Sequence, residues 1–121
     1  MKYKTYVIDI DGTISNCPMG QYELSVPMMD RIEYINELYD QGHIIKYLTA
    51  RGMGRHHDIV NKVYEQFYEL TVQQLQEWGC KYHELIMGKP SGDHYIDDKG
   101  INDSEFFGDD SYHGLRYEAR Y

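Results

Sequence analysis

The chain has 121 residues, 41% hydrophobic and 26% charged, which is typical of one globular domain and excludes a collagen-like or disordered chain. Its formal net charge of −8 at pH 7 disfavours a nucleic-acid partner, and no apolar run approaches the roughly 20 residues that span a bilayer. Two cysteines cannot form a disulfide framework and no signal segment opens the sequence, so we expect a cytoplasmic protein without a membrane partner.

The first third of the chain predicts a strand, a loop and a helix. Residues 6–10 form a short β-branched run that is typical of a buried strand, and an Asp-Gly pair follows it. Residues 13–26 show no clean period, so we expect a loop there. Pro27 suits the first position of a helix, whose apolar residues recur at helical spacing until Gly42 stops it.

The remainder of the chain alternates strands with helices. Residues 43–48 predict a strand that ends at Thr49, and a glycine-bearing loop follows over 51–54. Residues 58–78 show the apolar period of a long amphipathic helix, which Gly79 stops. Two more strands and a short helix are predicted over residues 84–87, 94–97 and 101–107.

This alternation predicts an α/β fold with a parallel sheet and right-handed crossovers. We expect a single domain over residues 1–121. It should be a three-layer, Rossmann-like domain with helices on both faces of the sheet.

Polar side chains follow three of the predicted strands. They are Asp9 and Asp11, Thr49, and Asp97 with Asp98. Because ligands bind outside the carboxyl ends of parallel strands, we expect these groups to converge. Crowded carboxylates require a proton or a cation between them, and Mg²⁺ prefers carboxylate and water oxygens. Either acidic pair taken alone is equally well explained as a turn or a helix cap.

Four segments resemble, in order, the motifs of the haloacid dehalogenase-like (HAD) phosphohydrolase superfamily. These segments are Asp9-Ile10-Asp11-Gly12-Thr13-Ile14, Leu48-Thr49-Ala50-Arg51-Gly52, Gly88-Lys89-Pro90 and Tyr95-Ile96-Asp97-Asp98. Residues 95–102 are also similar to the corresponding part of small HAD-type hydrolases found near bacterial surface-sugar and capsule pathways. The resemblance implies a phosphatase that acts on a small phosphorylated metabolite, such as a sugar phosphate.

The resemblance also implies a role for each motif residue. Asp9 would be the nucleophile that forms an aspartyl-phosphate, and Asp11 would be the general acid and base. Thr49 would donate a hydrogen bond to a phosphoryl oxygen. Lys89 would neutralise charge on the phosphoryl group and on Asp9.

The implied cofactor is Mg²⁺. Its ligands would be the carboxylate of Asp9, the main-chain carbonyl of Asp11, and Asp98, with Asp97 as a second ligand or as the holder of a bound water. The order of the last pair stays open. Arg51 and Gly12 are candidate substrate contacts, because an arginine beside the motifs could grip a second anionic group.

Many relatives carry a cap domain, and this chain has no segment long enough for one. Residues 13–26 are too short for a folded cap, and residues 52–89 are taken up by a helix and a strand of the core. The resemblance therefore implies a capless enzyme. The thirteen tyrosines suit either a contact between subunits of a homo-oligomer or half-exposed surfaces, and the sequence leaves both open.

Two alternatives remain beside the phosphatase. The same phosphoaspartate could pass its phosphoryl group to an acceptor other than water, which would make the protein a phosphotransferase. The fold could instead serve as a catalytically silent module that binds a metal or a partner.

Overall fold

The computed structural model describes residues 2–109. In chain order its elements are β1 (Thr5–Ile8), β2 (Ser15–Asn16), the 3-10 helix η1 (Tyr22–Leu24), β3 (Val26–Pro27), α1 (Met29–Asp40), β4 (Ile44–Thr49), α2 (Val60–Glu77), β5 (Glu84–Met87) and α3 (Asp103–Phe107). Within residues 2–109, none of the helices is both long and apolar enough to cross a bilayer.

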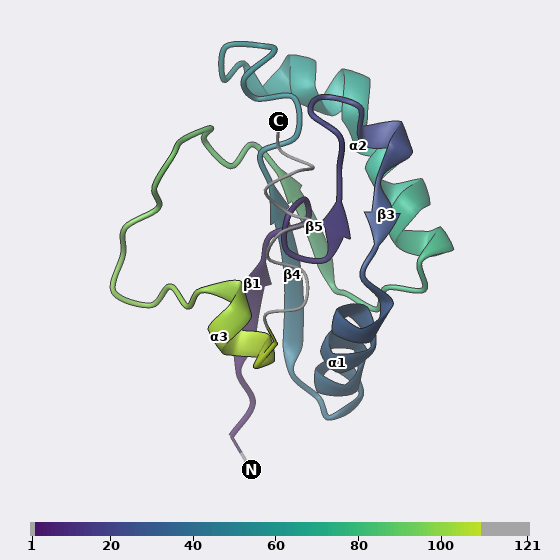
Figure 1. Ribbon diagram of the computed structural model, residues 1–121, viewed down its shortest axis with the longest axis vertical. Coiled ribbons are helices and arrows are strands. Elements are labelled where there is room, and N and C mark those ends of the chain that lie inside the picture. The colour runs from purple at the N-terminus through teal and green to yellow at the C-terminus, as the bar shows by residue number, and fades with distance from the viewer. Residues whose placement is uncertain (1, 110–121) are drawn as a thin grey trace.

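The central element is a three-stranded parallel sheet in the order β1-β4-β5. Helix α1 connects β1 to β4 and helix α2 connects β4 to β5, because parallel neighbours need a crossover rather than a hairpin. Figure 1 shows α1 and α2 on the same side of the sheet, with α3 on the other side of the view beside β1. The predicted α/β class is confirmed, and the three strands end at a common edge.

The two faces of this sheet are buried unequally. Side chains alternate between the faces, and Ile45, Tyr47 and Thr49 of β4 are at most 1% exposed. On the opposite face, Val7 is 58% exposed and Ile44 is 41% exposed. The two long helices thus cover one face, and the helical layer expected on the second face is not found among residues 2–109.

The core fills the space between the sheet and the two long helices. It includes Ile32 and Ile35 of α1 and Val63, Phe67 and Leu75 of α2, all of them buried. Their helical spacing is what predicted both helices, and burying each such side chain contributes about 1.5–3 kcal/mol relative to its exposed state. This core fixes the strands whose ends carry the predicted site.

The segment between β1 and α1 is more regular than the sequence indicated. Strands β2 and β3 pair antiparallel, with Ser15 opposite Pro27 and Asn16 opposite Val26. Pro27 therefore ends a small ribbon, and α1 begins at Met29 instead of at the proline. The sequence prediction missed this ribbon because strands of two residues are too short to show a period of two.

The strand predicted at residues 94–97 is not formed, and that prediction was wrong. Figure 1 shows that the chain leaves the sheet after β5 and follows a wide loop to α3. Ile96 is 93% exposed. The Asp97 carboxylate accepts hydrogen bonds from the backbone N–H groups of Lys99 and Gly100, at 2.8 and 2.5 Å. This local aspartate turn offers the backbone an alternative to strand pairing.

The thiol of Cys80 lies in a partly buried position near the hydroxyl of Tyr47. Burial raises the pKa of the Cys80 thiol from 9.0 to about 12, and it also raises the pKa of Tyr47. The thiolate is the reactive form, so alkylation of Cys80 by iodoacetamide at pH 8 should be about 1,000-fold slower than in the unfolded chain. An unfolded chain loses this proton above pH 9, whereas the folded chain keeps it to about pH 12, so stability should fall with rising pH across that window.

Mass spectrometry of the alkylated peptides measures the first effect, and thermal denaturation between pH 8 and pH 10 measures the second. A Cys80→Ser variant is the control, because it should lose part of the alkaline decline. Alkylation of native Cys80 at the rate of the unfolded chain would contradict the expected burial.

Candidate functional site

Three of the predicted site residues lie together at the carboxyl edge of the sheet. Asp9 follows β1, Thr49 ends β4, and Lys89 follows β5. The ammonium Nζ of Lys89 lies 3.6 Å from Oδ1 of Asp9, and the backbone N–H of Lys89 donates to the carbonyl of Thr49 at 3.1 Å. The ends of the three adjacent strands thus bring the Asp9 carboxylate and the Lys89 ammonium together, with the backbone of Thr49 beside Lys89.

The environment of Asp9 is partly desolvated. Its side chain is 27% exposed, and the Thr13 hydroxyl donates to Oδ2 at 3.1 Å. Burial raises the pKa of the Asp9 carboxyl above its ordinary value of 3.8, and the Asp11 carboxylate adds to this effect, while Lys89 and the Thr13 hydrogen bond oppose it. A partly desolvated carboxylate beside a lysine is typical of functional sites. Thr13 was not predicted as a site residue.

Asp11 is held by an arginine instead of facing open space. The guanidinium of Arg51 binds it with two hydrogen bonds, Nε to Oδ2 at 2.8 Å and Nη2 to Oδ1 at 2.9 Å. The Ser15 hydroxyl also donates to Oδ1, at 3.0 Å. Both carboxylate oxygens therefore accept hydrogen bonds from within the protein, while the side chain stays 22% exposed.

The two predicted substrate contacts serve the fold itself. Arg51 is 2% exposed and its guanidinium binds Asp11, so the structure does not show the expected grip on a substrate anion. Gly12 adopts a φ of 85°, which favours glycine, and its N–H donates to the carbonyl of Ser15 at 2.8 Å. Thr49 is 1% exposed, and its Oγ1 accepts the N–H of Arg51 at 3.1 Å while keeping its own proton to donate.

The second acidic pair does not join the first. Asp97 and Asp98 lie in the exposed segment after β5, and Asp97 turns one oxygen to its own backbone. Among residues 2–109, no three His, Cys, Asp or Glu side chains lie close enough to hold a metal ion. With Asp11 engaged by Arg51, the four carboxylates expected around Mg²⁺ do not lie together among the described residues.

A ring contact nevertheless connects Lys89 to the segment that carries the second pair. Lys89 Nζ lies 4.2 Å from the centre of the Tyr95 ring, and the Tyr95 hydroxyl donates to the carbonyl of Pro90 at 2.6 Å. Lys89 therefore lies between Asp9 and Tyr95. Asp97 follows Tyr95 by two residues, a distance of at most about 7 Å along extended backbone.

A strap, defined here as residues 17–25, lies over the loop that follows β4. The N–H of Gly52 donates to the Tyr22 hydroxyl at 2.9 Å, and the Arg55 guanidinium donates to the carbonyl of Gly20 at 3.0 Å. The Tyr22 ring meets the Phe67 ring of α2 edge-on at 5.0 Å. The strap is thus fixed to the loop and to α2, and no periodicity in the sequence indicated these contacts.

Gly52 gives this packing a sharp test. It has a φ of +74°, and a Cβ added there would lie 2.5 Å from two atoms of the Phe67 ring. Gly52→Ala should therefore destabilise the fold by about 2–4 kcal/mol, the sum of left-handed strain and overpacking. Gly79 has a similar φ of +73° with nothing within 4 Å, so Gly79→Ala should cost only about 1 kcal/mol. Urea denaturation measures both, and equal losses would contradict the close packing of Gly52 on Phe67.

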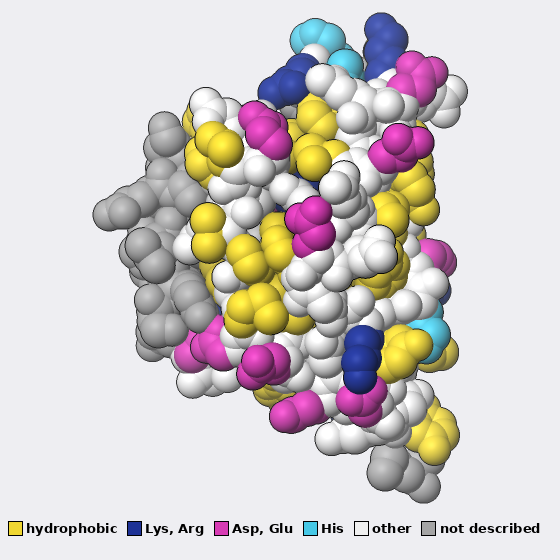
Figure 2. Space-filling model, turned by 90° about the vertical axis from the view of Figure 1, so that its right-hand side faces the viewer, with side chains coloured by type: hydrophobic (Ala, Val, Ile, Leu, Met, Phe, Trp, Pro, Cys, Tyr) yellow, Lys and Arg dark blue, Asp and Glu magenta, His cyan; other side chains and the backbone are white. Residues whose placement is uncertain are grey.

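The charge distribution of the surface also bears on the site. On the face that carries α1, α2 and β3, acidic side chains are spread widely (Figure 2). Most of the Lys, Arg and His side chains visible on this face gather at its upper end, the end at which the parallel strands of Figure 1 finish. On this face, Lys, Arg and His side chains are thus concentrated near the end at which the strands finish, although acidic side chains lie beside them.

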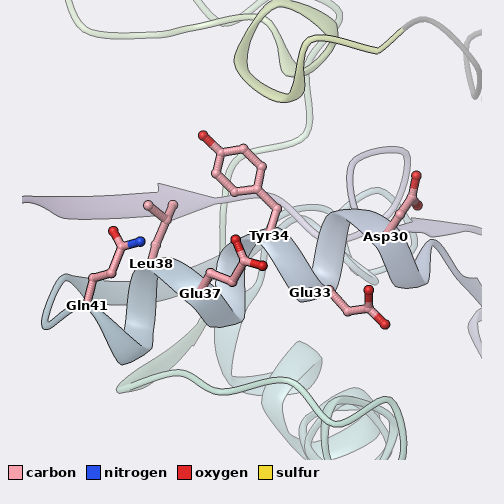
Figure 3. Close-up of a pocket in the computed structure, with 6 residues that line it drawn as sticks. All are labelled: Asp30, Glu33, Tyr34, Glu37, Leu38 and Gln41. Atoms are coloured by element: carbon pink, nitrogen blue, oxygen red, sulfur yellow. The ribbon is translucent and has the colours of Figure 1, made fainter.

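A shallow pocket of about 410 Å³ lies elsewhere, on the outer surface of α1. Its lining comes from that helix and from Gln41, which follows the helix end, as Figure 3 shows, and consists of Asp30, Glu33, Tyr34, Glu37, Leu38 and Gln41. It contains none of the side chains at the carboxyl edge of the sheet. We therefore place the candidate site at Asp9 and Lys89.

Comparison with known proteins yields one structural relative. No protein-family model matches the chain, and no curated protein matches it. A crystal structure from Vibrio cholerae, described as that of an MCSG target, is similar with a TM-score of 0.80 and 28% sequence identity. The similarity covers 95% of this chain and 98% of that chain. It therefore extends over nearly the whole α/β fold, and it assigns no activity.

Proposed function

We propose that this protein is a HAD-like phosphohydrolase that cleaves a small phosphomonoester, such as a sugar phosphate, through an aspartyl-phosphate on Asp9. The observation that carries the proposal is the Asp9–Lys89 pair, 3.6 Å apart, beside Thr49 at the carboxyl ends of adjacent parallel strands. Nucleophilic carboxylates of this kind need a cation and a hydroxyl donor at the transferring group.

The chemistry divides into two displacements at phosphorus. In the first, an oxygen of Asp9 forms a bond to phosphorus while the P–O bond to the leaving alcohol breaks, and the leaving oxygen takes up a proton. In the second, water attacks the same phosphorus, loses a proton, and frees Asp9 and inorganic phosphate. Lys89 and the Thr49 hydroxyl stabilise negative charge on the phosphoryl oxygens in both steps.

Proton transfer falls to Asp11 in this proposal. Its carboxylate lies two residues beyond Asp9, but Arg51 and Ser15 occupy both of its oxygens. We propose that Asp11 gives up one of these hydrogen bonds when it protonates the leaving oxygen. A rearrangement at Asp11 is therefore part of the proposed cycle.

Mg²⁺ belongs to the proposal as its cofactor. When bound, it would neutralise charge at the phosphoryl group. Asp9, the main-chain carbonyl of Asp11, and Asp98 with Asp97 would hold it. The described arrangement does not bring these donors together, so the segment after β5 must first approach Asp9. The contact between Lys89 and Tyr95 supports such an approach, since it already joins this segment to the site.

The proposal extends to the finer architecture. We propose a capless, Rossmann-like domain, because the segment between β1 and α1 holds only the small ribbon and the 3-10 helix. We place the enzyme in the cytoplasm, where its two free cysteines would stay reduced. A homo-oligomer that shelters the open site would suit the same architecture.

One observation favours the alternative of a catalytically silent module. Arg51 binds the Asp11 carboxylate, and Asp97 and Asp98 lie apart from Asp9 and Asp11. In the described arrangement the proposed nucleophile therefore has neither a free general acid nor a group of metal ligands beside it. Transfer of the phosphoryl group to another acceptor is the remaining alternative. Analysis of the products separates it from hydrolysis.

The decisive assay is a panel of phosphorylated metabolites, with and without Mg²⁺, followed by release of inorganic phosphate. The proposal expects turnover of at least one sugar phosphate or related monoester that EDTA abolishes. Transfer of phosphate to added sugars without release would favour the phosphotransferase. The absence of both phosphate release and phosphate transfer for every compound of the panel would favour the binding module.

A further inference from the structure

Arg51 lies at the centre of a buried polar network that joins four parts of the chain. It follows β4, its side chain is fully buried, and its partners come from the β1 end, the strap and α2. Burying a guanidinium is costly unless every donor is satisfied. The donors of the Arg51 guanidinium must therefore find partners within the protein.

All five N–H donors of the guanidinium are used. Nε and one Nη2 donor bind the two oxygens of Asp11, and the two Nη1 donors bind Thr71 Oγ1 at 3.1 Å and Gln74 Oε1 at 2.5 Å. The second Nη2 donor reaches Ser25 Oγ at 3.4 Å. No donor is left for a substrate. A lysine at this position has three donors and no planar fork, so it cannot reproduce the set.

The same network holds the strap. Gln74 accepts from Arg51 and donates its Nε2–H to the carbonyl of Tyr22 at 2.7 Å. The Arg51 guanidinium also lies 5.2 Å from the centre of the Tyr22 ring, and Ser25 is the last residue of the strap. The orientation of Asp11 and the position of the strap therefore depend on one side chain.

We propose that Arg51 is a positioning residue that couples Asp11 to the strap: while the strap is seated, Arg51 holds both oxygens of Asp11, and displacement of the strap releases one of them. The inference rests on the proposed function for its catalytic consequence. The coupling itself is a property of the folded chain and is measurable without turnover.

The first experiment measures the coupling by hydrogen exchange of the backbone amides of residues 17–25. Arg51→Lys, Asp11→Asn and the double variant should each speed this exchange at least 10-fold, and the double variant should exceed neither single variant. Gln74→Met, which removes the link to Tyr22 while keeping the charges, should speed it as well. Additive effects, or a strap unaffected by all four variants, would overturn the proposal.

A matched control is available in Arg31, a second buried arginine. Arg31 is 1% exposed, and it binds Asp103 at 2.7 Å, Asp109 at 2.8 Å and the carbonyl of Thr13 at 2.9 Å. Arg31→Lys also disturbs a buried guanidinium, so it should lower stability without selectively loosening residues 17–25. If both arginine variants speed hydrogen exchange of residues 17–25 equally, Arg51 has only a structural role, and the proposal is overturned.

The second experiment uses the substrate found in the phosphatase panel. Arg51→Lys should lower kcat by about 10–100-fold with little change in KM. Gln74→Met should act in the same direction, whereas Arg31→Lys, which leaves Asp11 and its partners untouched, should change kcat less. A kcat that is unchanged in Arg51→Lys would overturn the positioning role. If the wild-type protein hydrolyses nothing, the proposed function fails, and the exchange experiment alone decides the coupling.

Discussion

Replacing Asp9 with Asn should reduce phosphate release by at least about 1,000-fold while leaving the fold intact. The amide of Asn cannot form the covalent phosphoryl intermediate, because its oxygen is a poor nucleophile. It can still accept the hydrogen bond from Thr13, which holds Oδ2 at 3.1 Å in the wild-type protein. The assay is release of inorganic phosphate from the best substrate of the panel, together with circular dichroism.

The same variant should be at least as stable as the wild-type protein at pH 7. Burial raises the pKa of Asp9, so the folded state prefers the protonated form. The stabilisation that protonated Asp9 contributes is therefore fully present below pH 3.8, the ordinary pKa of the group. It is lost as the pH rises through the raised pKa of the folded state. The free energy of unfolding of Asp9→Asn should exceed that of the wild-type protein at neutral pH, and this difference should vanish below about pH 4.

Asp40→Asn is the matched control for both measurements. The Asp40 side chain is 57% exposed and is paired with Lys81 at 2.9 Å, at the end of α1 that precedes the start of β4. It should keep full activity and change stability by less than about 1 kcal/mol. Full activity of Asp9→Asn, with the fold intact, would show that Asp9 is not the nucleophile.

Asp98→Asn should lower turnover by about 100-fold and raise the Mg²⁺ concentration needed for half-maximal activity. Asp98 lies in the exposed segment after β5, so its loss should leave the stability of the fold unchanged. A large kinetic effect without a stability effect is expected only if this segment approaches Asp9 during the reaction. Titration of activity with Mg²⁺ measures the expected shift.

Asp93→Asn, in the same exposed segment, controls for the general effect of removing a negative charge there. It should retain wild-type activity and wild-type Mg²⁺ dependence. If Asp98→Asn and Asp97→Asn both behave like Asp93→Asn, the second acidic pair has no part in the site. The assignment of Mg²⁺ to these residues would then be wrong.

The sheet and its two long helices were predictable because their residues repeat with a clear period. Ile45, Tyr47 and Thr49 alternate along β4, and Val63 and Phe67 recur at helical spacing along α2. The strand expected at 94–97 failed for a local reason: the Asp97 carboxylate binds backbone N–H groups within its own turn. A short apolar run beside such an aspartate does not distinguish a strand from a turn.

The positions of Asp9 and Thr49 were predictable because both residues stand at the ends of predicted strands, whereas Lys89 was indicated only by the resemblance to the HAD motifs. The three residues lie at one edge because β1, β4 and β5 are adjacent and parallel. The role of Arg51 was not predictable, because its partners on α2 lie 20 and 23 residues further along the chain. An arginine next to a phosphatase-like motif has the same appearance in sequence whether it faces a substrate or a buried aspartate.

The most direct test is chemical trapping of the intermediate on the chain. The protein is mixed with its substrate, quenched within milliseconds and treated with borohydride, which reduces an aspartyl-phosphate to homoserine, and its peptides are then sequenced by mass spectrometry. We predict homoserine at position 9, absent without substrate and absent in Asp9→Asn. Turnover that leaves position 9 unmodified, or a phosphoryl group trapped on another residue, would contradict Asp9 as the group that accepts phosphorus.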